Sequence, residues 1–474
     1  MRFDHKRVLK MRCSYGVREK KGLGLMILLG VCFLSILGSR VSQANTGMEN
    51  ISYGAKSAGM GGTAVAVGDD STAMNVNPAT ISKIDGGRID MNLEMMFPFF
   101  SFENKDATGM RILNDTNGKT PIYLIPSAGF VYHKKGSRWS FGLGMFNEGG
   151  TGTDYGILRV DNRFLEMLPA GTPSFSNVEY FSNLGYMKLT PTVSYNITDR
   201  LAVAISPQVG YSTMRMKMPF FMDQNVNGIP DTLFAADMDG KAFSLGAKVG
   251  ILYKFSEEFG LGFAYSTPVD IHLKGDATMV APIAQMGGTV PAQSIMDGDL
   301  EMDIGWPQSV KAGMFWKMGF LNRMLLAFDV EWFDWSHYFD SIPVKLKNVT
   351  MDGIPQPDRK FKMDLKWKDQ WVFKLGLEYP ATDKLKLRMG YVYGKNPISS
   401  SQGVLAVMNP FVEHHITGGI GYQISGNFEF NMALIYGVNK NEKVGARHTM
   451  SPDMMNSTTG MEFFSTSIML SYKW

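Results

Sequence analysis

Histidine, serine and acidic side chains are the groups that could carry catalysis in this chain of 474 residues. The sequence contains no H-E-x-x-H, no G-x-S-x-G and no Walker loop, and none of its histidines stands at metal-ligand spacing. His414 and His415 are adjacent, so on a strand they would face opposite ways. A lipid hydrolase with a serine and a histidine on neighbouring strands stays open as an alternative. We nevertheless expect a protein that is not an enzyme.

One segment has the spacing that begins a calcium-binding loop of the D-x-N-x-N-G type. The twelfth position, where a bidentate glutamate is expected, holds Phe234 instead. The sequence therefore predicts either a structural calcium in an extracellular loop or an ordinary Asn/Gly turn, and it indicates no other cofactor. The candidate calcium ligands are Asp223, Asn225, Asn227 and Asp231.

Methionine is unusually frequent, with 35 residues, and its flexible, polarisable side chain suits surfaces that accept apolar ligands of varied shape. Two apolar groups are the candidate ligand contacts, although an aromatic girdle at a membrane interface would explain them nearly as well. A ligand with a carboxylate would also need a cation, unless the candidate cations pair with acids such as Asp329 and Glu331. The candidate apolar contacts are Phe97, Phe99, Phe100, Met218, Phe220, Phe221 and Met222, and the candidate cations are Lys311, Lys374 and Arg388.

The elements that must position these residues are β-strands, because apolar residues recur at every second position from about residue 87 to the end. In 326–335 one face carries Leu326, Phe328 and Trp332, whereas the other carries Asp329 and Glu331. A soluble β-sandwich also alternates and is a weaker alternative. The large, aromatic apolar face and the small, polar opposite face favour a transmembrane barrel with a polar interior.

Counting alternating segments gives fourteen strands, an even number as expected for a bacterial outer-membrane barrel. Short turns alternate with long loops, the longest of which are expected at 148–178, 217–239, 276–298 and 439–460. This asymmetry predicts periplasmic turns, extracellular loops and both termini in the periplasm. The last strand ends at Trp474, a terminal aromatic of the kind that barrel-assembly machinery recognises.

The chain divides into three parts: a signal peptide at 1–44, an N-terminal hatch at 45–86 and a barrel at 87–474. Basic residues precede the apolar run Leu23–Leu37, and Ser42-Gln43-Ala44 resembles a cleavage site. Both cysteines lie in this leader, so the mature chain has no thiol. The mature chain has a small net negative charge, which argues against a nucleic-acid partner. The fold class is therefore all-β, with a small helical hatch inside the barrel.

The hatch segment is rich in small residues and contains two helix-start signals. Asp70 is positioned to cap one short helix, and Asn77 followed by Pro78 begins a second. The segment is too poor in large apolar side chains to fold alone, so we expect it to fold inside the barrel as a plug. Its motif residues are Gly59, Gly61, Gly62, Asp69, Asp70, Asn77, Pro78 and Ala79.

This motif resembles the hatch of the FadL/TodX family of outer-membrane transporters for hydrophobic compounds. Segments 331–336, 367–371, 388–391 and 415–419 are similar to later strands of that family. The resemblance implies a fourteen-stranded barrel closed by the hatch, and passive movement of apolar molecules that leave sideways through a gap at a kink in the third strand. That strand is expected at 139–147, where glycines would allow bending or bulging. The candidate gap residues are Gly142, Gly144, Gly149 and Gly150.

These observations predict diffusion-driven uptake of long-chain fatty acids or aromatic hydrocarbons by a multi-pass barrel of the bacterial outer membrane. The expected partners are the hydrophobic ligand, outer-membrane lipid and lipopolysaccharide, and the assembly machinery during biogenesis, with the mature protein a monomer. A general porin for polar solutes is the first alternative. It would need an unblocked lumen, whereas the lipid hydrolase is the less favoured alternative.

Overall fold

The computed structural model describes residues 47–119, 121–166, 173–222, 230, 232–281, 294–319, 323–398, 405–408, 412–445, 448 and 451–474. These residues belong to one compact unit, Val41–Trp474. None of the helices within the described ranges is long and apolar enough to cross a bilayer.

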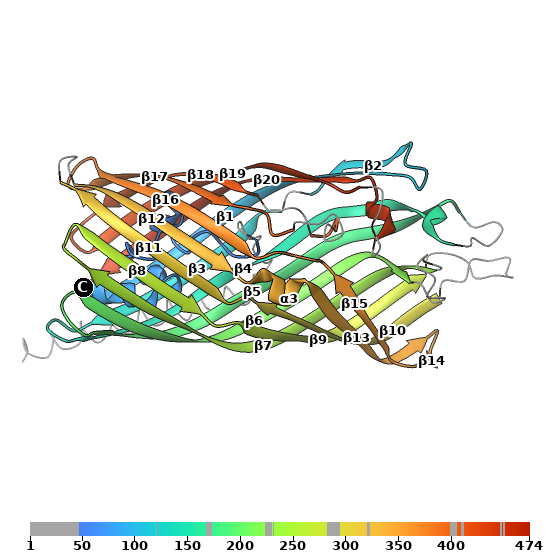
Figure 1. The fold of residues 1–474 in the computed structure, drawn as a ribbon, viewed down its shortest axis with the longest axis horizontal. Coiled ribbons are helices and arrows are strands. Elements are labelled where there is room, and N and C mark those ends of the chain that lie inside the picture. The colour runs from blue at the N-terminus through green and yellow to red at the C-terminus, as the bar shows by residue number, and fades with distance from the viewer. Residues whose placement is uncertain are drawn as a thin grey trace, which may run out of the picture. The chain divides into compact units, whose positions relative to one another are not determined.

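The unit is a closed antiparallel barrel of fourteen strands, as the sequence predicted (Figure 1). Ten strands are continuous and four are each broken into two elements. The first strand closes the barrel on the last, with Arg88 opposite Lys473 and Glu103 opposite Thr458. The strands are β1 Gly86–Lys105, β3 Tyr123–His133, β4 Trp139–Asp161, β5 Phe175–Asn196, β6 Leu201–Met222, β7 Thr232–Lys254, β8 Phe259–Ser266 with β9 Val269–Ala281, β10 Ser294–Trp306 with β11 Ser309–Met318, β12 Met324–Phe333 with β13 Ser341–Met351, β15 Arg359–Asp364 with β16 Gln370–Pro380, β17 Leu385–Gly394, β18 His414–Gln423, β19 Phe428–Lys443 and β20 Thr458–Lys473.

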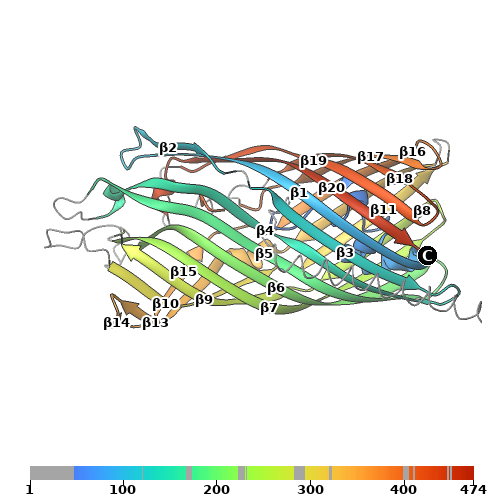
Figure 2. The ribbon, with the colours of Figure 1, turned by 180° about the vertical axis from the view of Figure 1, so that it is seen from behind.

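Short elements complete the barrel at its two ends. We call the end that holds the C-terminus and the hatch the hatch end, and the opposite end the loop end (Figures 1 and 2). At the loop end, β2 pairs with β1 and β14 pairs with β13. These elements are β2 Ile112–Asn117, β14 Ile354–Pro355, the 3-10 turns η3 Asn162–Phe164 and η5 Pro452–Met454, and helix α3 Trp335–Phe339.

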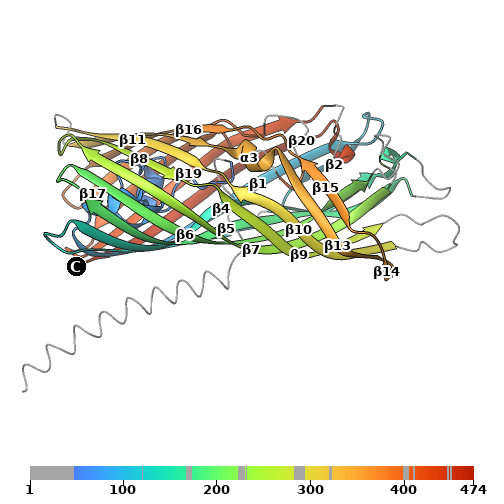
Figure 3. The ribbon, with the colours of Figure 1, turned by 60° about the horizontal axis from the view of Figure 1, so that its bottom comes forward.

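The four broken strands are neighbours in the wall, and they break at a similar level. Pro268 follows β8 and Pro307 follows β10, and proline cannot donate to a strand ladder. The other two breaks lie at helix α3, between β12 and β13, and at 365–369, between β15 and β16 (Figure 3). The barrel wall is therefore divided into a part near the hatch end and a part near the loop end.

Side-chain polarity reverses across these breaks. In β8, Leu261 and Phe263 are exposed on the outer face, as the sequence predicted for lipid contact. In β9, Ile271 and Leu273 are instead buried in the lumen, and Lys274 lies on the outer face. The expectation of an apolar exterior and a polar interior thus holds only near the hatch end. Toward the loop end, charged groups face outward and apolar groups fill the interior.

Most of the predicted long loops are shorter than expected, because strands extend into them. β4 continues to Asp161, β6 to Met222 and β9 to Ala281, and β19 continues to Lys443. The alternation persists in these extensions, but its polarity is reversed, so it does not match the pattern of a lipid-facing strand. The expected third strand at 139–147 is correspondingly only the first part of β4.

The hatch lies inside the barrel and is drawn in blue in Figure 1. It contains α2 Ala55–Gly59 and two 3-10 helices, η1 Ser71–Asn75 and η2 Pro78–Lys83. Both predicted caps are confirmed: the Asp70 carboxylate accepts hydrogen bonds from the amides of Thr72 and Ala73, and the Asn77 side chain accepts one from Ala79. Strand β1 begins directly after the hatch, at Gly86.

Candidate functional site

The hatch is fastened to the wall through backbone groups. Asp329 on β12 accepts hydrogen bonds from the amides of Ala64 and Val65, at 2.8 and 3.0 Å. Asn77 donates to the carbonyl oxygens of Val65 and of Ile251 on β7, at 2.7 and 3.0 Å. The turn at Val65 is therefore tied to two strands on different parts of the wall, and buried bonds of this kind hold the plug in place.

Glycines let the hatch approach the wall closely. Gly61 and Gly62 have positive φ angles of 64° and 77°, which favour glycine. A Cβ on Gly61 would lie 2.9 Å from the carbonyl oxygen of Leu375 in the wall, and one on Gly59 would lie 3.1 Å from the Cα of Gly419. A Cβ on Gly62 would instead lie 1.9 Å from the carbonyl oxygen of Ile51, within the hatch. Asp69, by contrast, is half-exposed at the hatch end, where it forms an ion pair with Lys56. The hatch motif thus combines close-approach glycines with capping residues.

The predicted cations lie beside the hatch, and acids already occupy them. Lys311 lies 2.8 Å from Glu49, and Lys374 lies 2.8 Å from Glu331. Arg388 likewise contacts Glu378, at 2.8 Å. A ligand carboxylate at one of these cations stays a prediction, and it would have to compete with the acidic partner that each cation already has.

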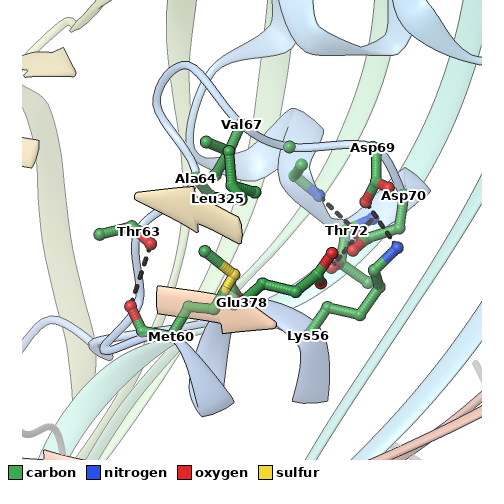
Figure 4. A pocket seen from close by; sticks show the side chains of 13 residues that line it. Lys56, Met60, Thr63, Ala64, Val67, Asp69, Asp70, Thr72, Leu325 and Glu378 are labelled. Atoms are coloured by element: carbon green, nitrogen blue, oxygen red, sulfur yellow. Dashed lines mark hydrogen bonds and ion pairs between the residues drawn. The ribbon is translucent and has the colours of Figure 1, made fainter. Parts of the chain in front are cut away.

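A small polar pocket lies between the hatch and the hatch ends of β12 and β16 (Figure 4). It has a volume of about 400 Å³ including its opening, and Lys56, Asp69, Thr72 and Glu378 contribute to its lining. Lys56 spans it to meet Asp69 at 2.6 Å. This pocket is charged and faces away from the apolar part of the lumen, so it does not suit an apolar ligand.

Strand β4 leaves its partner β3 partway along its length (Figure 2). The β3–β4 ladder ends where Ser127 faces Phe146, although both strands continue beyond this pair. The β4–β5 register shifts between Asn147 and Gly149, which marks a bulge. Gly149 and Gly150 have φ angles of 155° and 159°. Two of the four predicted gap glycines are therefore at an irregularity in the third strand.

Beyond the end of the β3–β4 ladder, the N-terminal part of the hatch pairs with the edge of β4 that no longer faces β3. The amide of Asn50 donates to the carbonyl of Glu148 at 3.1 Å, and the amide of Gly150 donates to that of Met48 at 3.0 Å. The wall at this point is therefore paired with the plug rather than with its neighbouring strand. Gly142 and Gly144 lie instead within the regular β3–β4 ladder, where Gly142 packs against Met74 of the hatch.

Glu49 is the charged anchor of this N-terminal part. Trp306 and Lys311 both donate hydrogen bonds to its carboxylate, at 2.9 and 2.8 Å. Burial alone would raise the pKa of Glu49, but Lys311, Lys248 and Lys188 surround it and lower the pKa to about 2.

We expect acid to loosen the segment at 47–53. The pKa of Glu49 is lower in the folded protein than the ordinary value of 4.5, so its contribution is complete above pH 4.5 and is lost as the pH falls toward 2. Amide hydrogen exchange at 47–53 should therefore accelerate between pH 4.5 and 2 relative to the intrinsic exchange rate, while Glu49→Gln should be fast already at pH 6. A rate for Glu49→Gln at pH 6 equal to that of the wild type would contradict this role.

An apolar pocket lies between the hatch and the loop end. Its volume is about 440 Å³ including its opening. Arg215 contributes to the lining, but its guanidinium pairs with Asp237 on the outer face. Among the described residues, no other lining residue carries a charge. The lining consists of Thr151, Ser182, Asn183, Leu184, Met214, Arg215, Met216, Met302, Ile304, Phe339, Ile342, Met363 and Met408.

None of the predicted apolar contacts lines this pocket, but five of the seven lie in or against the apolar core of the lumen. Phe100, Met218 and Phe221 are buried in the apolar core of the lumen, with Phe220 and Met222 packed against it. The prediction for Phe97 and Phe99 is wrong, because both lie on the outer face of β1, where Phe99 is 48% exposed. The residues of 95–102 are apolar on both faces of the strand, so alternation could not say which face is inside.

Sequence reasoning missed the pocket residues on β10, α3 and β15. In β10, Met302 and Ile304 alternate with Glu301 and Asp303. That alternation was available in the sequence, but it was read with the polar residues facing inward. The predicted calcium ligands, Asp223, Asn225, Asn227 and Asp231, lie outside the described residues. Within the described ranges, no group of three or more acidic, histidine or cysteine side chains is arranged to hold a metal ion.

Comparison with known proteins agrees with this geometry. Residues 36–468 match the model of the outer membrane protein transport family (OMPP1/FadL/TodX). The chain belongs to this family. It is an outer-membrane transport protein, and the resemblance noted in the sequence is confirmed.

Individual relatives are distant. The 47 kDa outer membrane protein of Pasteurella multocida is 22% identical over 348 residues, which cover 70% of this chain and 73% of that protein. The toluene transporter TodX of Pseudomonas putida superposes with a TM-score of 0.69 at 21% identity, covering 89% of this chain and 99% of that structure. A FadL homologue from Pseudomonas aeruginosa has a TM-score of 0.70 at 13% identity, with coverages of 90% and 99%. These structures share the fold of this chain.

Proposed function

We propose that this protein carries uncharged, apolar small molecules passively across the outer membrane and releases them sideways between β3 and β4. The observation that carries the proposal is the end of the β3–β4 ladder at Phe146, beyond which β4 bulges and pairs with the hatch. The hatch is tied to β7 and β12 by Asn77 and Asp329, which argues against an axial route. Apolar cargo instead gains by moving from water into hydrocarbon, so this route requires no energy source.

The charges of the lumen favour uncharged cargo. Three lysines beside Glu49, Glu148 and Glu331 form ion pairs with these acids, and a fourth, Lys248, donates to the carbonyl oxygen of Asn75. A buried carboxylate without a partner is costly, so a fatty-acid anion would have to break one of these pairs. An aromatic hydrocarbon has no such requirement, and TodX, which has the same fold, is described as a toluene transporter.

Uptake by intact cells is the direct test. Cells that lack outer-membrane pores for aromatics and express this protein should take up p-xylene faster than cells with an empty vector. Purified protein in a planar bilayer should pass little steady ion current. Large, steady currents would favour the general porin, and release of free fatty acid from phospholipid by pure protein would favour the lipid hydrolase.

A charge placed in the apolar pocket should prevent binding. Met302 is buried in the pocket lining, so Met302→Asp would bury an unpaired carboxylate there. We expect the affinity for p-xylene to fall at least about tenfold. The matched control is Glu301→Gln, because Glu301 is the next residue along β10 but faces outward to Lys347. Equal losses in the two variants, both with the β-sheet circular dichroism of the wild type, would argue against the pocket as the binding site.

A further inference from the structure

A layer of polar side chains lies directly below the apolar pocket, on its hatch side. Leu184 and Met214 of the pocket lining face each other on β5 and β6. The next inward-facing pair on these strands is Tyr186 and Ser212, about 7 Å further toward the hatch. Ser244 belongs to the following layer on β7, where it faces Gly210. The lining therefore changes from apolar to hydroxyl-bearing within one layer.

The buried hydroxyls of Tyr186 and Ser244 lie beside each other, and the buried Ser212 hydroxyl has no hydrogen-bond partner among the described residues. Tyr186, Ser212 and Ser244 are 2%, 0% and 6% exposed. The Nε2 of Gln208, which is also buried, lacks an acceptor as well. Buried polar atoms are normally hydrogen-bonded, so the unpartnered Ser212 hydroxyl and Gln208 amide on β6 call for an explanation.

The position of the group indicates a binding role. Gly210 lets these side chains pack closely over its backbone, since a Cβ at this residue would lie 2.7 Å from the Tyr186 hydroxyl and 2.4 Å from the Ser244 hydroxyl. The ring of Tyr186 packs against that of Trp306, with centroids 5.0 Å apart, and Trp306 in turn binds Glu49 of the hatch. The polar layer thus forms the floor of the pocket, between the apolar lining and the paired charges beside the hatch.

The chemistry of the layer selects a neutral oxygen. A ligand hydroxyl can donate to these hydroxyls and accept from them, and a ligand carbonyl can accept from them. The lysines near this layer are already bound, Lys188 to Glu148, Lys311 to Glu49 and Lys248 to the carbonyl oxygen of Asn75, so a carboxylate would have to displace one of these contacts. We propose that this layer binds the single hydroxyl or carbonyl oxygen of an otherwise apolar, uncharged ligand whose hydrocarbon part lies in the pocket above. This inference rests on the proposed function and narrows its substrate class.

A pair of isosteric ligands tests the proposal. p-Cresol and p-xylene differ by a hydroxyl in place of a methyl group, and at pH 7 the phenol is neutral because its pKa is about 10, like that of tyrosine. Binding of each would be measured by calorimetry with the protein in lipid nanodiscs, against empty nanodiscs. We expect Ser212→Ala and Tyr186→Phe to lower the affinity for p-cresol about fivefold to tenfold and to leave the affinity for p-xylene unchanged.

The matched control is Ser206→Ala. Ser206 is an inward-facing, buried residue of the same strand, but its hydroxyl is already bonded to Thr192, at 2.8 Å. Ser206→Ala should therefore leave the affinities for p-cresol and p-xylene as in the wild type. Equal effects of Ser212→Ala on the affinities for the two ligands would overturn the polar subsite. An unchanged affinity for both ligands, which is the result expected if the layer only holds water, would overturn it as well. Failure of the wild type to bind either compound would overturn the proposed function as well.

Discussion

Replacing Gly149 with alanine should reduce p-xylene uptake at least about tenfold, close to the level of cells without the protein. A Cβ at this position would lie 1.8 Å from the carbonyl oxygen of Met48, and the φ of 155° is one that residues with a side chain rarely adopt. The bulge and its pairing with residues 48–50 could not persist together. Strand β4 would then move toward β3, and the proposed exit would close.

The control for this variant separates backbone strain from the exit itself. Gly353 also has a positive φ, of 79°, but a Cβ there would meet nothing within 4 Å. Gly353→Ala should therefore cost some stability and leave uptake unchanged. The amount of folded protein in the membrane would be compared by the electrophoretic shift on heating. Normal uptake by a well-folded Gly149→Ala variant would show that cargo does not leave beside β4.

Releasing the Val65 turn should convert a sealed barrel into one that passes ions. Asp329→Ala removes the acceptor of two buried amides, and Asn77→Ala removes the link from Val65 to Ile251. Each unsatisfied buried group costs about 1–3 kcal/mol, so the double variant should lose several kcal/mol of hatch attachment. We expect bursts of current in planar bilayers where the wild type is nearly silent.

Replacing Asp329 with asparagine should give a smaller effect on the current than replacing it with alanine. Asp329→Asn keeps a side-chain oxygen that can still accept from the Ala64 or Val65 amide, so its bursts should be rarer than those of Asp329→Ala. Deleting 47–85 would remove the plug and should give the largest currents of the series. Silent recordings from the deletion variant, with folded barrel present, would mean that the hatch is not what seals the lumen.

The glycine and hatch experiments address different steps of one route. A cargo molecule in the apolar pocket has the hatch below it and, at the level of Gly149, a wall that is paired with the hatch instead of with β3. Opening this site requires only that the segment at 47–53 part from β4, while the barrel stays closed through β1 and β20. The route thus places the moving part within the plug rather than in the wall.

The sequence by itself determined the strands, the caps and the family. Side chains alternate across a strand whatever its surroundings, so the periodicity of 326–335 was sufficient to identify a membrane-facing strand. Caps are equally local, and Asp70 and Asn77 cap the helices that their neighbours in sequence begin. The count of fourteen followed because each strand carries its own signal.

Only the tertiary structure decided which face is inside, which charges are paired and where β4 parts from β3. Phe97 and Phe99 face outward because closure of β1 against β3 and β20 fixes its orientation, and the residues of 95–102 are apolar on both faces. Lys311 meets Glu49 across 262 residues of chain, a partnership that no local pattern encodes. The bulge at Gly149 likewise depends on carbonyl and amide groups of residues 48–50, about a hundred positions away. Each of these features depends on register and closure, which belong to the assembled barrel and not to any one strand.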